Sequence, residues 1–175
     1  IDRSVFPVNQ GGPFMAAIAA KAVCFGEALQ PGFSQYANRV VENARKLATI
    51  LADGGMRIVT GGTDTHLFLV DLTSMELTGR DAEEALSSVG IYVNRNTIPN
   101  DTKPARVTSG LRIGTPALTT RGMGPDEMEI VGKLILRTVT NIGDQTVAKE
   151  VRDGVAALTS GFPVPGISTE GAWPL

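Results

Sequence analysis

The segment TSGLRIGTPA, residues 108–117, sets one charged side chain, that of Arg112, in an apolar and glycine-rich run. A strand is expected over residues 110–113. A guanidinium in such surroundings needs an anionic partner, and the carboxylate of a small molecule can accept two parallel hydrogen bonds from it. An internal Asp or Glu, or water reached by the end of the side chain, would also satisfy Arg112. The segment alone leaves these alternatives open.

The chain around this strand alternates short β-rich runs with helical periodicities. Two such runs flank the turn-forming residues 61–64, which predicts an antiparallel pair. A capping-box-like start at Thr78 predicts the beginning of a helix. The expected strands are at 56–60, 66–72, 91–94 and 110–113, and the expected helices at 78–90, at 124–143 and from about 146. Together they predict an α+β fold, a small antiparallel sheet faced by helices.

The N-terminal part of the chain predicts helices and no strand. Residues 1–12 form an arm with a glycine loop, too short to have a core of its own. Residues 14–29 predict a helix that is apolar on nearly all sides, so we expect another surface to cover it. Apolar residues at steps of three and four, from Phe33 to Leu51, predict an amphipathic helix that ends near residues 54–55.

Composition narrows the classes of function. The 175 residues carry a formal net charge of -2, which argues against binding to nucleic acid or to an anionic membrane. No stretch resembles a signal peptide or a membrane-spanning segment. The single cysteine, Cys24, favours a reducing compartment, and we expect its side chain to be buried. The sequence therefore predicts a cytoplasmic protein without a metal site, since one histidine and one cysteine at unrelated positions cannot assemble one.

Two short motifs have both a structural and a functional interpretation. Gly11 and Gly12 precede a helix, where free backbone N–H groups can bind a phosphate, although such glycines are often a plain turn. Residues 94–96, Asn-Arg-Asn, are interpreted as a polar loop suited to reading a ligand by hydrogen bonds. Structural roles are expected for His66, Asp64 and Asp71 around the hairpin, and for residues 97–105, an ordinary turn.

Four blocks taken together carry a family resemblance: residues 5–13 (VFPVNQGGP), 61–72 (GGTDTHLFLVDL), 93–101 (VNRNTIPND) and 107–122 (VTSGLRIGTPALTTRG). In this order and spacing the chain resembles the C-terminal half of serine hydroxymethyltransferase, a pyridoxal-phosphate enzyme of fold type I, like aspartate aminotransferase. The likeness extends to about Pro163. It implies an arm between subunits at 1–12, long interdomain helices at 13–55 and a small C-terminal α+β domain at 56–163. The tail at 164–175, rich in Pro and Gly, is expected to be loosely ordered.

The resemblance also implies a reaction and roles for named residues. In the family, serine is converted to glycine and its side-chain carbon passes to tetrahydrofolate, with pyridoxal phosphate as cofactor. Arg112 matches the residue that binds the amino-acid carboxylate, and Asn96 a residue that helps to hold the folate. Gly11 and Gly12 match the loop that binds the cofactor phosphate of the partner subunit. Phe6 matches a residue at the edge of the partner's active site.

The family's cofactor lysine has no counterpart in this chain. None of the five lysines follows the run of threonines and histidine that marks that lysine in the family. We therefore expect a C-terminal portion that begins just after it, inactive by itself, whose partners are the missing N-terminal cofactor domain and further copies in a homodimer or tetramer. Two alternatives stay open: a non-enzymatic module that binds small amino acids, and a module that only completes an oligomer.

Overall fold

The computed structural model describes residues 1–167 and divides the chain into two compact units, residues 1–37 and residues 38 onward. The first unit holds a π-helical turn, η1 (Ser4–Asn9), the helix α1 (Met15–Ala28) and the start of α2 (Pro31–Asp53). The predicted helix at 14–29 is confirmed. Most of the predicted tail at 164–175 lies outside the described residues, which end at residue 167.

The apolar side chains of helix α1 are exposed to solvent in this chain. The exposed ones include Met15, Ile18, Val23 and Phe25. Cys24 is exposed as well, so the expectation that it is buried is wrong. An apolar sequence forms the helix, but burial needs a second surface, and no residue of α1 is fully buried. Association through α1 stays a prediction.

The second unit is built on a four-stranded antiparallel sheet in the order β1-β2-β4-β3. The strands are β1 (Arg57–Ile58), β2 (Leu67–Asp71), β3 (Asn94–Asn96) and β4 (Gly110–Gly114). The predicted pairing of 56–60 with 66–72 is confirmed, as is a strand at 110–113. The strand expected at 91–94 is wrong in position. The backbone N–H of Ile91 bonds to the carbonyl of Leu86 and closes the preceding helix, so pairing with β4 begins only at Asn94.

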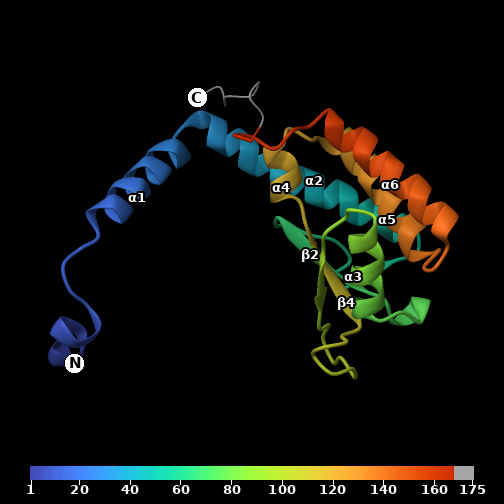
Figure 1. Cartoon of the computed structure of the whole chain (residues 1–175), viewed down its shortest axis with the longest axis horizontal. Coiled ribbons are helices and arrows are strands. Elements are labelled where there is room, and N and C mark those ends of the chain that lie inside the picture. Colours follow the sequence, from blue (N-terminus) through green and yellow to red (C-terminus); the bar gives the residue numbers. More distant parts are fainter. Residues whose placement is uncertain (168–175) are drawn as a thin grey trace. The chain divides into compact units, whose positions relative to one another are not determined.

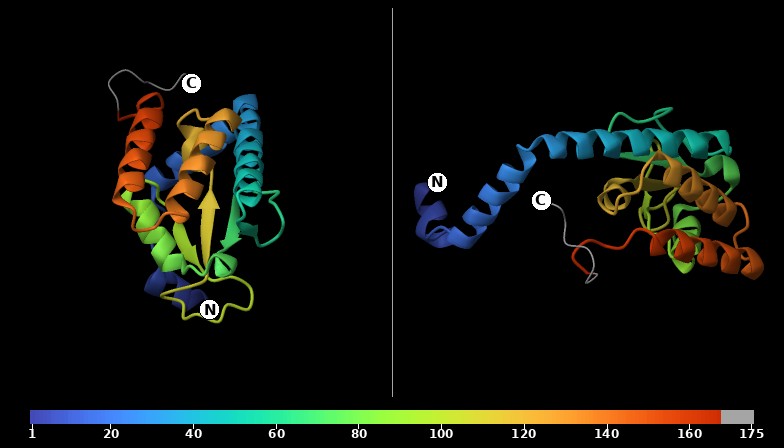
Figure 2. Two further views of the ribbon diagram at one scale, coloured as in Figure 1. Left: turned by 90° about the vertical axis from the view of Figure 1, so that its right-hand side faces the viewer. Right: turned by 90° about the horizontal axis from the view of Figure 1, so that it is seen from above.

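Helices cover one face of this sheet. They are α2, α3 (Gly79–Ser88), α4 (Pro116–Thr120), α5 (Pro125–Val139) and α6 (Gln145–Ser160), with a 3-10 turn, η2 (Thr73–Met75), after β2. α2 and α5 pass close to each other, and α6 packs beside α5 (Figures 1 and 2). The predicted cap of α3 is confirmed, because the Thr78 hydroxyl accepts a hydrogen bond from the backbone N–H of Asp81 at 3.1 Å.

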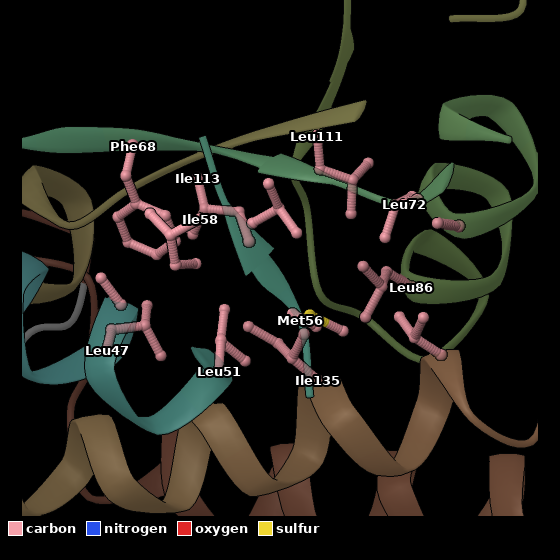
Figure 3. Close-up of a cluster of buried hydrophobic side chains, with 14 of the residues drawn as sticks. Leu47, Leu51, Met56, Ile58, Phe68, Leu72, Leu86, Leu111, Ile113 and Ile135 are labelled. Atoms are coloured by element: carbon pink, nitrogen blue, oxygen red, sulfur yellow. The ribbon is translucent and has the colours of Figure 1, made fainter. Parts of the chain in front are cut away.

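The core lies between the sheet and α2, α3 and α5. Leu47 and Leu51 of α2 and Leu86 of α3 point toward Leu111 and Ile113 of β4 (Figure 3). All five side chains are at most 3% exposed. Burying an aliphatic side chain of this size contributes roughly 1.5–3 kcal/mol, so this cluster fixes which face of β4 points inward. Ile142, inside the helix expected at 124–143, is exposed because α5 already ends at Val139.

Residues 1–167 show neither a membrane-spanning helix nor a cluster of metal-ligating side chains. No helix there has both the length and the apolar character needed to cross a membrane. No group of three or more His, Cys, Asp or Glu side chains lies in a metal-binding arrangement in the same residues.

Candidate functional site

Arg112 lies in the middle of β4, on the face of the sheet opposite the core. Its neighbours Leu111 and Ile113 are buried, and the alternation of a strand therefore turns Arg112 outward, where it is exposed. Its Nη2 donates a hydrogen bond to Oδ1 of Asn94 at 3.1 Å. Within residues 1–167 it forms no ion pair, so of the three alternatives the internal acid is excluded there, and the site can accept an external anion.

The polar motif at 94–96 is a strand, and the prediction of a loop is wrong. Asn94 pairs with Arg112 and Asn96 with Gly110, so both asparagines share the outward face with Arg112. Arg95 points the other way, toward α3. Its backbone N–H donates to Glu83 Oε1 at 3.0 Å, and its Nε lies 3.5 Å from Glu83 Oε2. The structure thus brings the two predicted site residues Arg112 and Asn96 onto adjacent strands.

The connection between β3 and β4 is held by Asp101. Its carboxylate accepts hydrogen bonds from the backbone N–H groups of Ile98, Lys103 and Ser109 and from the Ser109 hydroxyl. The Lys103 N–H and the Ser109 groups lower the pKa of Asp101 to about 2. Thr108, next to Ser109, is buried with φ at +59°, a conformation that costs a β-branched residue on the order of 1–3 kcal/mol. The turn expected at residues 97–105 is thus held in place by the hydrogen bonds of Asp101, which extend its ordered part to Ser109.

Asp101→Asn is expected to lower the melting temperature of the chain at pH 7, because an amide cannot accept all four hydrogen bonds. Since the pKa of Asp101 in the folded chain lies below the ordinary value of 3.8, the carboxylate's contribution to stability is complete above pH 3.8 and is lost as the pH falls through about 2. The difference in melting temperature between variant and parent should therefore become smaller over that pH range. Thermal unfolding followed by circular dichroism measures it. Asp153→Asn, at an exposed Lys149 pair, is the control. A constant gap from pH 7 to pH 2 would contradict the role of Asp101.

Asp71 lies opposite Gly110 in the pairing of β2 with β4, on the same face of the sheet as Arg112. It is buried and pairs with Arg57 across β1 and β2, and the Thr73 hydroxyl donates to it at 2.6 Å. Burial acts to raise the pKa of Asp71, but the hydrogen bonds from Thr73 and the Arg57 guanidinium outweigh it and hold the pKa below its usual value. Asp71 is therefore occupied by internal partners.

The structural roles expected around the hairpin fit the contacts made there. Asp64 is exposed and pairs with Arg45 at 2.8 Å. The backbone carbonyl of His66 accepts a hydrogen bond from the N–H of Thr115 at 3.0 Å, and the imidazole is exposed. Neither residue shares the Arg112 row of the sheet.

The other predicted site residues belong to the first unit. Phe6 is exposed, and so are Gly11 and Gly12. Neither glycine N–H donates a hydrogen bond to any of the described residues, and a Cβ built on either glycine meets nothing within 4 Å. The loop before α1 thus offers two backbone donors, the chemistry that a phosphate needs.

Comparison with protein-family models supplies the class of this chain. A model described as serine hydroxymethyltransferase matches residues 1–135, which include both asparagines of β3 and Arg112. The match places the chain among transferases of pyridoxal-phosphate fold type I, and the predicted α+β fold is confirmed. The chain belongs to the serine hydroxymethyltransferase family.

Proposed function

We propose that this chain is the C-terminal portion of a hydroxymethyltransferase that interconverts serine and glycine with tetrahydrofolate as the one-carbon acceptor. The observation that carries the proposal is Arg112, exposed in the middle of an ordered sheet with no anion paired to it in the described residues. A planar guanidinium held in this way binds a carboxylate through two parallel hydrogen bonds. Arg112 would thereby hold serine or glycine and fix which bond at Cα is broken.

The other residues receive roles that follow the family. Asn96, two residues from Asn94 on the same face, would hold the folate. Its Nδ2 donates to the Thr97 carbonyl at 2.7 Å, which leaves Oδ1 as an acceptor for a donor on the ligand. Gly11 and Gly12 would bind the cofactor phosphate of a partner subunit, and Phe6 would line the edge of the partner's site.

Pyridoxal phosphate supplies the electron sink for the carbanion at Cα when it is bound. The residues of this chain fit only its phosphate, through the free N–H groups of Gly11 and Gly12. All five lysines are exposed, and Lys133 and Lys149 are paired with Glu129 and Asp153 at 2.7 Å. Covalent attachment of the cofactor is therefore assigned to the N-terminal cofactor domain of the family, and not to these five lysines.

Reconstitution tests the proposal. The chain is mixed with the N-terminal cofactor domain of a family member, and the tetrahydrofolate-dependent conversion of serine to glycine is measured. Activity in the mixture, and none in either part, is the expected result. A complex that forms but shows no conversion would contradict the proposal.

A second function, as a module that only completes an oligomer, is favoured by one observation. The apolar side chains of α1, among them Met15 and Phe25, are exposed over the length of the helix. Calorimetry with glycine, with and without pyridoxal phosphate, separates the cases. A chain that binds neither but sediments as a dimer fits the oligomer module, and one that binds glycine without the cofactor fits a non-enzymatic amino-acid-binding module.

The isolated chain is expected to form no stoichiometric adduct with pyridoxal phosphate at one defined lysine. All five lysines are exposed, and an exposed lysine side chain with no activating neighbour is a weak nucleophile. The measurement is borohydride reduction of the mixture followed by peptide mass spectrometry. One saturable adduct at a single lysine would show that the cofactor lysine lies within this chain.

A further inference from the structure

We propose that Asn94 is a positioning residue that aims Arg112 at the carboxylate of the amino-acid substrate. This inference rests on the proposed function, in which Arg112 binds that carboxylate. Asn94 lies directly opposite Arg112 in the pairing of β3 with β4. Its Oδ1 accepts the hydrogen bond from Arg112 Nη2 at 3.1 Å, the one hydrogen bond that the Arg112 side chain makes within residues 1–167.

The side chains that lie beside Arg112 on the two neighbouring strands explain why Asn94 orients the guanidinium. Leu69, Arg112 and Asn94 occupy equivalent positions on β2, β4 and β3. Directly opposed residues of an antiparallel pair have Cβ atoms about 4.5–5.5 Å apart, within reach of a polar contact. Leu69 is apolar and offers no acceptor. Without Asn94, the long Arg112 side chain would be free to adopt many rotamers, and ordering it on binding would reduce affinity.

The chemical type of the partner also matters. An asparagine oxygen takes one of the five guanidinium N–H donors and carries no charge, so the positive charge of Arg112 stays available. The remaining donors include one on Nη2 and both on Nη1, which suffice for two parallel bonds to a carboxylate. An aspartate at position 94 would neutralise Arg112 and compete with the substrate.

Asn94 is itself held in place. The neighbouring Arg95 is fixed to α3 through its backbone N–H and its guanidinium, both bound to Glu83. Residues 94–96 pair with β4 over their full length. The Asn94 side chain therefore projects from a backbone anchored on two sides, which is what precise orientation of a binding group requires.

A double-mutant cycle in the holoenzyme, with the cofactor domain present, tests this role. Asn94→Ala is expected to raise KM for serine about tenfold with kcat changed less than about twofold, because ground and transition states lose the same contact. In an Arg112→Lys background the same substitution should change KM, or kcat/KM where saturation is not reached, by no more than about twofold. A purely structural asparagine would have the same effect in both backgrounds.

Two further variants complete the test. Asn94→Asp keeps the shape of the side chain and should raise KM more than Asn94→Ala does. Asn141→Ala, at an exposed asparagine whose amide bonds to the Arg137 carbonyl, is the control and should leave KM unchanged. An equal effect of Asn94→Ala in both backgrounds, an unchanged KM, or a milder effect of Asn94→Asp would overturn the role of Asn94. An unchanged KM in Arg112→Lys alone would instead remove the proposed function, and this inference with it.

Discussion

Arg112→Lys in the holoenzyme is expected to raise KM for serine and glycine at least about thirtyfold, roughly 2 kcal/mol of lost binding. Lysine keeps the positive charge but loses the planar pair of donors that matches a carboxylate. Cofactor binding, followed by its absorbance, should be nearly unchanged, since the cofactor lysine and the phosphate loop are elsewhere. Steady-state kinetics with serine and tetrahydrofolate provides the measurement.

Arg95→Lys is the matched control, the same exchange on the adjacent strand. Arg95 contacts Glu83 and not the outward face of the sheet, so its effect should be mild. Asn96→Ala should weaken folate binding more than serine binding. A KM for serine within about twofold of the parent in Arg112→Lys, a difference of roughly 0.4 kcal/mol, would make Arg112 a structural residue and refute its assignment.

Elements with strong local signals could be predicted from the sequence. The capping box at Thr78 and Asp81, the apolar periodicity of α2 and the turn between β1 and β2 each depend on residues close together in the chain. The alternation of β4 is also local, with Arg112 between two buried residues. The same strand is part of the family resemblance, and the match of the family model to residues 1–135 confirms that resemblance.

The parts that could not be predicted depend on contacts distant in sequence. β3 consists of Asn, Arg and Asn, residue types that do not favour strands, and it is extended because it pairs with β4. Asp101 looks like a turn residue, yet its bonds to Ser109, eight residues later, order the whole connection. The short α4 begins after Thr115, whose hydroxyl donates to the Val40 carbonyl at 2.8 Å. The periodicity of residues close together in the sequence does not predict contacts of this kind.

Gly110→Ala is expected to destabilise the second unit by about 3 kcal/mol or more, among the largest effects of a single methyl group. A Cβ at this position would lie 2.6 Å from the Val70 carbonyl oxygen and 3.1 Å from that of Asn96. These oxygens belong to the strands on either side of β4, so neither can move without breaking the sheet. Urea denaturation of the chain, followed by circular dichroism, measures the change in the free energy of unfolding.

Gly62→Ala is the control for this prediction, because a Cβ there meets nothing within 4 Å and the effect should stay below about 0.5 kcal/mol. Gly110 lies two residues before Arg112, and its lack of a side chain lets β2 and β3 approach β4 from both sides. That approach places Asn94 within hydrogen-bonding distance of Arg112. If Gly110→Ala left the free energy of unfolding within about 0.5 kcal/mol of the parent, β4 would not be confined as described, and the geometry argued for Asn94 and Arg112 would lose its physical basis.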